Sequence, residues 1–493
     1  MHHVNPGTAK RVAIIGAGIA GLATAVRLAA KGMEVEVFEK NAYPGGKLSH
    51  FAFGEYQFDA GPSLFTQAAQ VDELFRLCGL NPEDHFSYYR SDEACRYFFE
   101  SGKKMTAYAD RYKLASEMAS QLGENEEDVV RYMNSSESAF NHIGTLFLTK
   151  SLHKISSFSF REIWSAIRAT RPGYLLSSMN DYNKNLLKTK EAVQIFNRYA
   201  TYNGSNPFTA PAMLSMIPHL EINEGTFYPA GGMISITRSI HQLGERMGVK
   251  FHFNAPVDSI LTEGKKLKGL RVNGEKLNFD AIVSNMDVYY TYGKLLGNQV
   301  RAKKVLKQER SSSAVIFYWA VNTSFLELGL HNIFFTEDYQ AEFQHIFERA
   351  SMYHDPTVYI NITSKMESNQ APEGAENWFV MVNAPHDKGQ DWEAFRSEAR
   401  QNVLAKLTRM LGRNPEPHIV FEDYLDPPLI DRKTNSYTGS LYGTSSNSKF
   451  AAFLRHPNFS SSYQGLYFVG GSVHPGGGIP LCLRSAEIVS NLI

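Results

Sequence analysis

The chain has 493 residues, a length that suggests two or three domains with a large buried core. Its 50 basic and 50 acidic residues give zero formal net charge, which argues against charge-driven nucleic-acid binding because that mode needs excess Lys and Arg. Hydrophobic residues make up 43% of the chain, as in globular proteins. The three cysteines are far apart, so they predict neither a disulfide framework nor a zinc site and favour a reducing compartment.

Residues 12–30 are mostly apolar and follow Lys10 and Arg11, a pattern that resembles the start of a secretion signal. The glycines in this stretch and the charge of Arg27 are unfavourable in a membrane-spanning helix. No other stretch approaches the run of about 18 apolar residues that spanning requires. We therefore expect a protein that is soluble or attached only to a membrane surface.

The pattern of residues 12–39 predicts a strand, a helix and a second strand. Residues 12–15 form a short apolar run, which is typical of a buried parallel strand. The glycine-rich stretch 16–21 follows, and apolar residues then recur at helical spacing as far as Gly32, a suitable residue to end a helix. Residues 34–39 alternate and end in Glu39. This arrangement is the dinucleotide-binding fingerprint in its full structural context.

Each residue of the fingerprint has a physical role. Gly16 allows a tight turn, Gly18 lets the backbone approach a pyrophosphate, and Gly21 lets the helix pack closely on the strand. The helix N-terminus favours phosphate charge, and Glu39 is expected to accept hydrogen bonds from ribose hydroxyls. The sequence therefore predicts a Rossmann-type cofactor domain.

A second glycine pair distinguishes FAD from NAD. Pro44-Gly45-Gly46-Lys47 comes soon after Glu39, and Gly61-Pro62-Ser63 follows Asp59. This arrangement resembles the FAD-binding superfamily of amine oxidases and phytoene desaturases, in which the stretch wraps the flavin side of the cofactor. The family usually has Arg at the position of Lys47; Lys keeps the charge but lacks the planar fork of Arg. An ordinary turn at Gly45-Gly46 is the structural alternative.

The C-terminal residues repeat the combination of a strand, glycines and a helix. Residues 465–469 are a short apolar strand, and five glycines lie within 470–478. Pro480 suits the first turn of a helix that continues through 481–493. Glycines let backbone lie against a flat ring, and a helix N-terminus favours the negative charge of a reduced flavin. The alternatives are a glycine-rich surface loop and a purely structural role for His474.

The middle of the chain supplies further strands. Residues 251–257 read as the entry to another strand, and 272–285 read as paired strands with turn signals at Gly264 and Asn273-Gly274. The superfamily pairs adenine with the backbone of a residue that matches Val257. The cofactor domain is thus expected to be assembled from separated segments.

Four stretches in this order together resemble the carotenoid (phytoene) desaturase family of FAD-dependent oxidoreductases. They are Phe58–Ser63, Phe227–Gly232, Val283–Asp287 and Gly470–Pro480, which match the family patterns FDAGPS, FPxGG, SNAD and VGxxTHPGxGIP. Val473 replaces the usual Thr and Met286 replaces the usual Ala, and neither change removes a charged or reacting group. Residues 199–221 with this terminus are similar to bacterial enzymes acting on hydroxylated acyclic carotenoids, so the finer expectation is a hydroxycarotenoid 3,4-desaturase.

The resemblance implies an α/β fold with a Rossmann-type FAD-binding domain of the amine-oxidase and phytoene-desaturase superfamily and an inserted α+β substrate-binding domain. Its FAD-binding domain would comprise residues 8–85, 225–310 and 441–493. Residues 86–224 would form a substrate and membrane-associated region, and 311–440 the second segment of the substrate domain.

The resemblance also implies the residues that contact FAD. They are Gly16, Gly18, Ala20, Gly21, Glu39, Lys40, Gly46, Lys47, Gly61, Pro62, Ser63, Val257, Asn285, Gly471, Ser472, Gly478, Ile479 and Pro480.

The family reaction converts a C–C bond of an acyclic C40 carotenoid into a double bond, as a step of carotenoid biosynthesis. FAD accepts a hydride from an allylic carbon, and a base or water removes the neighbouring proton; oxygen or a quinone would then reoxidise the flavin. No metal-binding pattern is visible among the 16 histidines, and no side chain is assigned as a catalytic acid or base.

A substrate this apolar resides in lipid, so a membrane-binding segment is expected. Between residues 150 and 171, five basic residues accompany Phe158, Phe160, Ile163, Trp164 and Ile167 against a single acid, Glu162. This composition is typical of an interfacial helix, and an amphipathic helix buried against the core is the equal alternative. The expected location is the cytoplasm, peripheral on the inner face of the cell membrane.

Two other classes of protein share these features. One is a different FAD oxidase, such as an amine oxidase, and the other is a non-catalytic relative that binds isoprenoids without redox turnover. The glycine-rich stretches at both ends of the chain speak against the second, because an isoprenoid carrier has no need of bound flavin.

Overall fold

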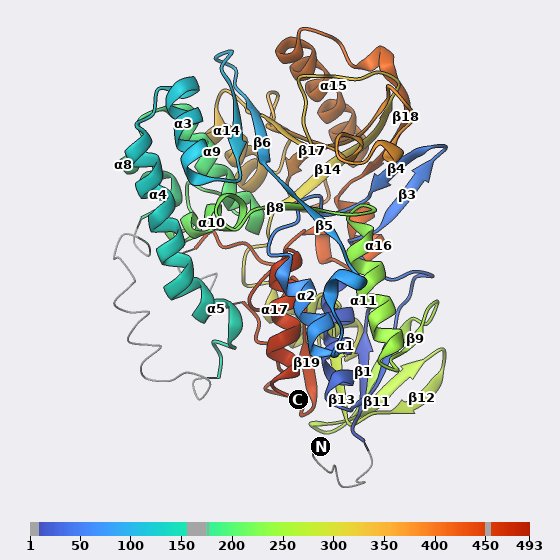
Figure 1. The fold of residues 1–493 in the computed structure, drawn as a ribbon. Helices are drawn as coiled ribbons and strands as arrows, with labels where there is room; N and C mark the ends of the chain where they lie inside the picture. The colour runs from blue at the N-terminus through green and yellow to red at the C-terminus, as the bar shows by residue number, and fades with distance from the viewer. Residues whose placement is uncertain (1–8, 155–173, 175–176, 449–454) are drawn as a thin grey trace.

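The computed structural model describes residues 9–154, 174, 177–448 and 455–493. They form two lobes, each built around its own sheet (Figure 1). The lower lobe in this view holds a five-stranded sheet, and the upper lobe holds a seven-stranded sheet with helices around it. We call them the parallel-sheet lobe and the mixed-sheet lobe.

The parallel-sheet lobe has the strand order β19-β13-β1-β2-β9, and all neighbouring strands are parallel. The strands are β1 (Arg11–Ile15), β2 (Glu34–Phe38), β9 (Lys250–His252), β13 (Ala281–Ser284) and β19 (Leu466–Phe468). They come from three distant parts of the chain, and β1 lies in the centre. The prediction of an α/β fold with a Rossmann-type sheet is confirmed.

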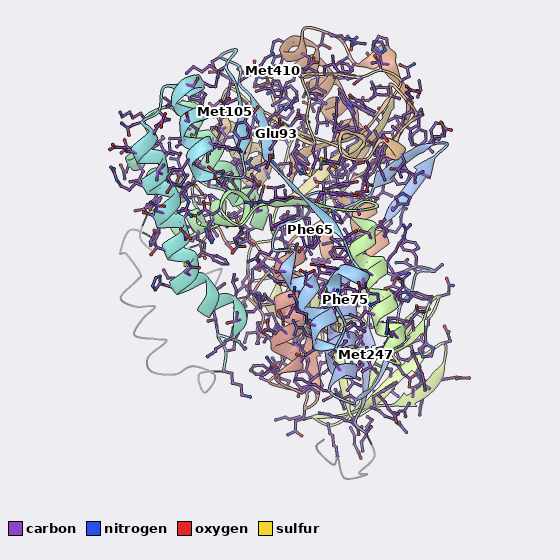
Figure 2. All side chains as sticks on the ribbon, in the orientation of Figure 1. Phe65, Phe75, Glu93, Met105, Met247 and Met410 are labelled. Carbon is purple, nitrogen blue, oxygen red and sulfur yellow. The ribbon has the colours of Figure 1, made fainter. Side chains whose placement is uncertain are left out.

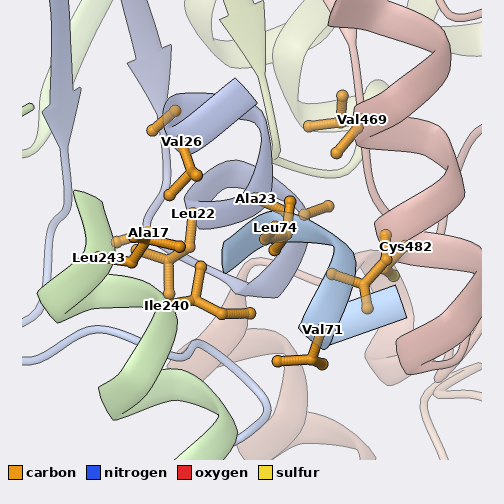
Figure 3. Close-up of a cluster of buried hydrophobic side chains, with 14 of the residues drawn as sticks. Ala17, Leu22, Ala23, Val26, Val71, Leu74, Ile240, Leu243, Val469 and Cys482 are labelled. Carbon is orange, nitrogen blue, oxygen red and sulfur yellow. The ribbon is translucent and has the colours of Figure 1, made fainter. Parts of the chain in front are cut away.

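Among the described residues, four helices share one hydrophobic core with this sheet: α1 (Ile19–Ala30), α2 (Ala69–Leu77), α11 (Ile234–Arg246) and α17 (Ile479–Ser490). Figure 3 shows Leu22, Val26, Leu74, Ile240 and Leu243 meeting in the core between them. The helix predicted after the first glycine loop and the one predicted at the C-terminus are therefore both present. Burial of their apolar faces fixes the position of the helix N-termini at the sheet edge.

A three-stranded antiparallel sheet flanks this lobe, built from β10 (Val257–Glu263), β11 (Lys266–Val272) and β12 (Glu275–Asn278). Its turns fall at Gly264 and Asn273-Gly274, as predicted. The strand entry predicted over 251–257 contains the end of β9 and the start of β10, because Asn254 has a left-handed φ of 52° and turns the chain between them. Likewise, β13 leaves the predicted pair 272–285 and joins the parallel sheet.

The mixed-sheet lobe has the order β18-β14-β17-β16-β15-β6-β7. Its strands are β6 (Glu93–Phe98), β7 (Lys104–Tyr108), β14 (Ser313–Val321), β15 (His331–Phe334), β16 (Val358–Ile362), β17 (Glu376–Ala384) and β18 (Ile419–Leu425). All neighbours are antiparallel except β6 and β15. Two stretches of the chain therefore meet in one sheet.

The alternation of side chains along β14 gives this sheet two different faces. Phe317 and Trp319 are fully buried against α15 (Trp392–Leu411), whose Phe395 lies in the same cluster. Ile316 and Tyr318 point to the opposite face, where they line a cavity. The sheet is thus covered on one side by a helix and forms a cavity wall on the other.

The remaining helices and strands surround these two sheets. The helices are α3 (Arg111–Leu122), α4 (Glu126–Ala139), α5 (Thr145–Thr149), α8 (Met179–Leu186), α9 (Lys190–Asn197), α10 (Pro218–Ile222), α12 (Val288–Tyr290), α13 (Gln299–Val305), α14 (Tyr339–Gln344) and α16 (Pro427–Thr434). The strands are β3 (His50–Phe53), β4 (Tyr56–Asp59), β5 (Tyr88–Ser91) and β8 (Thr226–Pro229). Figure 2 labels Phe75 and Met247 in the parallel-sheet lobe, Met105 and Met410 in the mixed-sheet lobe, and Phe65 between them.

Two contacts cross the segment boundaries expected from sequence. The β3–β4 hairpin belongs to the segment 8–85, yet Phe58 packs edge-on against Tyr318 of the mixed-sheet lobe, with ring centroids 6.0 Å apart. β5, from 86–224, pairs with β8 of the next segment. These crossings join the two lobes, and the segment boundaries themselves stay predictions.

Candidate active site

A cavity of about 830 Å³ lies between the lobes. That volume is within the range of about 300–1,000 Å³ for small-molecule sites. Its wall includes the glycine loop before α1, the carboxyl end of β2 and the start of α17, and it extends to the free face of the mixed sheet. One continuous space therefore joins the predicted cofactor loops to an apolar chamber.

Every predicted cofactor-contact residue except one lines this cavity. The lining residues are Gly16, Gly18, Ala20, Glu39, Lys40, Gly46, Lys47, Gly61, Pro62, Ser63, Val257, Asn285, Gly471, Ser472, Gly478, Ile479 and Pro480. Gly21 lies beneath the wall, where an added Cβ would be 2.1 Å from the carbonyl oxygen of Gly16. Gly21 thus serves the close packing of helix and loop.

The first glycine loop brings the N-terminus of α1 to the cavity. Gly16 has a φ of 96°, a conformation that favours glycine, and Gly18 is the helix N-cap without a side-chain cap. An added Cβ on Gly18 would lie 2.8 Å from Asn285 Nδ2. The loop therefore has no room for side chains and presents backbone N–H groups, which suits a pyrophosphate.

The Glu39 carboxylate is fixed at the end of β2. Its two oxygens accept the backbone N–H groups of Ala17 and Asn41, each at 2.9 Å, and the side chain is buried. A carboxylate has about four acceptor positions, so these two bonds leave capacity for ribose hydroxyls.

The second glycine pair closes against the first loop. The backbone N–H of Gly45 donates to the carbonyl of Ala17, and an added Cβ on Gly46 would lie 3.4 Å from the Gly18 Cα. Lys47 Nζ donates to the carbonyl of Leu441 at 2.7 Å. Burial lowers the pKa of Lys47 to about 8. The pair is a tight turn, as the alternative proposed, and the same turn lines the cavity.

The motif that begins at Phe58 joins the two lobes. Asp59 accepts the backbone N–H groups of Met233 and Ile234 at 3.0 and 3.3 Å, so it caps the start of α11. Burial raises the pKa of Asp59 to about 6. Gly232 packs so closely that an added Cβ would lie 3.3 Å from this carboxylate. The motifs Phe58–Ser63 and Phe227–Gly232 therefore meet at Asp59. This contact holds the fold together at the start of α11.

The third motif also combines a cavity residue with a buried ion pair. Asn285 Nδ2 donates to the carbonyl of Gly16 at 3.3 Å. Asp287 and Arg310 form an ion pair at 2.7 Å, with both side chains almost fully buried. Met286, at the position where Ala is usual, lines the cavity.

The C-terminal glycine loop is buried, so the alternative of a surface loop is wrong. Gly478 has a φ of 100°, and an added Cβ there would meet no atom within 4 Å. At Gly477 an added Cβ would lie 2.6 Å from the Tyr442 ring. α17 begins at Ile479 without a side-chain cap. A second helix N-terminus therefore lines the cavity.

His474 lies outside the cavity lining. Its Nε2–H donates to the carbonyl of Lys150 at 3.0 Å, and its ring packs against Phe147. Burial lowers the pKa of His474 to about 4, so the ring is neutral at neutral pH. The geometry therefore supports a structural role for His474.

Arg455 is a buried cation at the same site that sequence reasoning missed. It is 1% exposed and donates to the carbonyls of Tyr442, Thr444 and Gly471 and to Asn203 Oδ1. Burial lowers its pKa to about 10, which still leaves the guanidinium charged at neutral pH. Its partners come from distant loops, so no local pattern could have identified it.

The far part of the cavity has an apolar wall and a buried polar cluster. Met213, Leu214, Met216, Ile217 and Leu220 line it from one side. The cluster is centred on Arg198 and Glu221, which form an ion pair at 2.8 Å and bind the hydroxyls of Tyr97, Tyr199 and Tyr202. Tyr199, Tyr202 and Glu221 of this cluster belong to the stretch 199–221, which resembles enzymes acting on hydroxylated carotenoids.

The described residues offer little for nucleophilic or metal chemistry. Cys95 and Cys482 line the cavity as free thiols, and burial raises their pKa values to about 12 and about 11. Both are therefore protonated at neutral pH and poor nucleophiles. Within the described ranges, no group of three or more His, Cys, Asp or Glu side chains is placed to hold a metal ion.

The expected membrane-binding segment 150–171 lies outside the described residues from position 155 onward. In the part of the chain that is described, no helix combines the length and the apolar composition needed to cross a membrane.

Comparison with known proteins shows the family of this chain. Residues 19–493 match the family model of flavin containing amine oxidoreductases. The chain is 47% identical over 484 residues to 1-hydroxycarotenoid 3,4-desaturase of Flavobacterium sp. (strain P99-3), covering 98% of this chain and 99% of the relative. Phytoene desaturase of Neurospora crassa is 31% identical over 506 residues, covering 97% and 84%.

The chain therefore belongs to the flavin-containing amine oxidoreductase family, and the relatives named above place it among the carotenoid desaturases. The solved structure of putrescine oxidase bound to putrescine matches 99% of each chain with a TM-score of 0.62. At 14% identity, that likeness shows the fold alone.

The protein is an FAD enzyme, and the residues of the cavity fit this cofactor. The uncapped N-termini of α1 and α17 both line the cavity, where they favour negative charge. Glycines keep side chains away from the space between them, and Glu39 retains acceptor capacity on the same wall. The partly buried Lys47 and the buried Arg455 add positive charge nearby.

Proposed function

We propose that the protein desaturates a 1-hydroxylated acyclic C40 carotenoid at the 3,4 bond with FAD as the hydride acceptor. The observation that carries the proposal is the single cavity that joins the cofactor loops to an apolar chamber. The 47% identity to a desaturase with this substrate over nearly the full chain supports the finer assignment.

In this proposal the predicted contact residues hold the cofactor. Glu39 binds the ribose hydroxyls, the α1 N-terminus binds the pyrophosphate, and the α17 N-terminus favours charge on the reduced ring. FAD, when bound, supplies the hydride acceptor. The loops from Gly46 to Ser63 lie between this cofactor part and the mixed-sheet lobe.

The other side chains of the cavity position the polyene and exclude water. Ile316, Phe379 and Met381 come from one face of the mixed sheet, and Met213 and Leu220 come from the helical side. An extended apolar substrate held between these walls is fixed against the cofactor, and such positioning supplies much of the catalysis in hydride transfer. A base or water takes the neighbouring proton.

The test uses the purified, FAD-loaded protein without oxygen. Mixing it with a 1-hydroxylated acyclic carotenoid should bleach the flavin absorbance and give a product with one more double bond at the 3,4 position. Phytoene and a panel of amines are the comparison substrates. Flavin reduction by an amine alone would favour an amine oxidase, and purification without flavin would favour the non-catalytic isoprenoid-binding alternative.

We further propose that the enzyme is cytoplasmic, binds peripherally to the inner face of the cell membrane and passes its electrons to oxygen or a quinone. The basic and aromatic composition of residues 150–171 supports the membrane proposal, because each Lys or Arg near an anionic surface contributes about 1 kcal/mol. Replacement of three arginines, Arg161, Arg168 and Arg171, by Glu should weaken cosedimentation with anionic liposomes at low salt. Unchanged binding by the folded variant would support the core-helix alternative.

A further inference from the structure

His331 is a polar residue on a mainly apolar wall. The mixed sheet presents Ile316, Phe379 and Met381 to the cavity from β14 and β17. On β15, His331 and Ile333 are two residues apart, so they lie on the same face, and both line the cavity. His331 is only 4% exposed. A buried imidazole in such a wall needs a hydrogen-bonding reason to be there.

The surroundings of His331 determine which ring nitrogen carries the proton. Asn361 Nδ2 donates to the carbonyl of Leu330 at 3.0 Å, which fixes the amide orientation, and it also lies 3.2 Å from His331 Nδ1. The Tyr359 hydroxyl is 2.8 Å from the same nitrogen. Because an N–H group faces it, Nδ1 is an acceptor. Burial is the main cause that lowers the pKa of His331 to about 3, and the positive charge of Arg198 adds to it, so the ring is neutral at neutral pH. Since Nδ1 is the acceptor, the single ring proton is on Nε2.

That Nε2–H group has no hydrogen-bond partner among the described residues. The hydroxyl of Tyr339, which also lines the cavity and is 6% exposed, has none there either. Arg198 and Glu221 of the polar cluster line the same cavity as these two side chains. Buried polar groups in proteins are usually hydrogen-bonded, and these two line the cavity, where a polar group of a ligand can supply the missing bonds.

His331 is linked to the cofactor side of the cavity. Tyr359, which contacts His331, is also 2.8 Å from Ser63 Oγ in the loop expected at the flavin. A 1-hydroxycarotenoid that is oxidised at C3 and C4 has only C2 between its hydroxyl-bearing carbon and the reacting bond. A group that recognises this hydroxyl must therefore lie close to the flavin, and His331 meets that requirement.

We propose that His331 determines specificity by binding the substrate hydroxyl: its Nε2–H donates to the hydroxyl oxygen, and the hydroxyl proton is donated to the Tyr339 oxygen. This inference rests on the proposed substrate class. A carotenoid without the hydroxyl leaves both protein groups unpaired in a buried cavity. Sites built in this way discriminate strongly against substrates that lack the polar group.

The experiment measures binding and turnover separately with the FAD-loaded protein. Two acyclic carotenoids of equal length, one with the 1-hydroxyl and one without, are titrated while the flavin absorbance is followed. The variants are His331→Phe, which keeps a ring but removes the donor, and Tyr339→Phe, which removes only the unpartnered hydroxyl. His331→Gln keeps an N–H donor and should recover part of the preference.

His241→Phe is the matched control. The Nε2 of His241 also lacks a partner among the described residues, but its ring packs on Phe251 and Phe253 and does not line the cavity. It should keep the wild-type preference for the hydroxylated carotenoid. His331→Phe should lower that preference about tenfold to a hundredfold, mainly by weaker binding of the hydroxylated compound.

The two possible failures are distinguishable. A wild-type protein that binds both carotenoids equally, or a wild-type preference retained in His331→Phe, would overturn the role of His331. If wild type prefers the hydroxylated carotenoid and the variants lose this preference, His331 is the receptor even where no desaturated product forms. In that last case it is the proposed desaturation that fails.

Discussion

The Glu39 carboxylate accepts the backbone N–H of Ala17 at 2.9 Å. This bond ties the carboxyl end of β2 to the turn between β1 and α1, so the ribose-binding and phosphate-binding parts of the fingerprint form one rigid unit. Because the carboxylate is oriented before any ligand arrives, little conformational entropy is lost when FAD binds.

Replacement of Glu39 by Ala should weaken FAD binding about tenfold to a hundredfold, since a hydrogen bond to a charged group is worth about 1.5–3 kcal/mol. Flavin occupancy after dialysis and a titration of the apoprotein with FAD measure the effect. Glu36→Ala is the control, because Glu36 lies on the same strand but pairs with Arg11 and His252 instead. Full occupancy in Glu39→Ala would exclude the ribose role.

Lys47 makes FAD binding dependent on pH. Burial lowers its pKa to about 8, below that of a free lysine, so the apoprotein loses this charge as pH rises through about 8. FAD is an anion and binds better to the charged form; affinity should therefore fall between pH 7 and 9. Lys47→Arg, which restores the residue usual in the family, should flatten this dependence because arginine stays charged.

FAD titrations of both proteins across that pH range provide the measurement. Parallel pH profiles for wild type and Lys47→Arg would mean that another group controls the dependence.

The local parts of the fold could be predicted from sequence because their causes are local. Gly16 adopts a left-handed φ, Gly21 touches the Gly16 carbonyl, and Pro480 begins α17, and each follows from the residue's own geometry. The break at Asn254 was missed, since a single residue with positive φ leaves no periodic signal. Its effect is to send the chain into a different sheet.

The long-range parts of the site could not be predicted. Arg455 gains its partners only when three loops converge, and His331 is identified by what it lacks, an acceptor for Nε2–H among the described residues. In the sequence neither residue belongs to a recognisable motif. The motif around Asp59 was recognised, but its role as the cap of α11 depends on a partner far away in the chain.

Asp59 should make the protein less stable as pH rises through about 4 to 6. Its pKa is raised to about 6 by burial, above the value of about 3.9 in an unfolded chain, so the folded state holds the proton more tightly. Stability from this group is present below about pH 4 and is lost as pH rises through about 6. The shift corresponds to about 3 kcal/mol.

Asp59→Asn keeps an oxygen to cap α11 and removes the titration. Between pH 4 and pH 7 the wild-type protein should lose the stability that Asp59 contributes, and the variant should not. The unfolding free energy of the variant should therefore rise relative to that of wild type over this range. Denaturant unfolding at several pH values measures it. Asp110→Asn, at the exposed cap of α3, controls for the amide itself. A constant difference across this range would contradict the assignment.

Gly478 and Gly477 should respond differently to substitution. An added Cβ on Gly478 meets no protein atom, but its φ of 100° is strained for other residues, so Gly478→Ala should shift the N-terminus of α17. Helix-end stabilisation of charge is worth about 0.3–2 kcal/mol, which corresponds to a flavin reduction potential about 10–40 mV lower. Gly477→Ala instead collides with Tyr442 and should mainly lower stability.

Spectroelectrochemical titration of the FAD-loaded variants separates the two effects, with thermal unfolding as the second measurement. Gly478→Ala should have a lower flavin reduction potential than wild type and should lose some FAD. Its thermal stability should stay close to that of wild type. Gly477→Ala should keep a near-wild-type potential in whatever fraction retains FAD. A wild-type potential in folded, FAD-loaded Gly478→Ala would mean that the start of α17 does not act on the flavin, and that its exposure to the cavity serves another ligand.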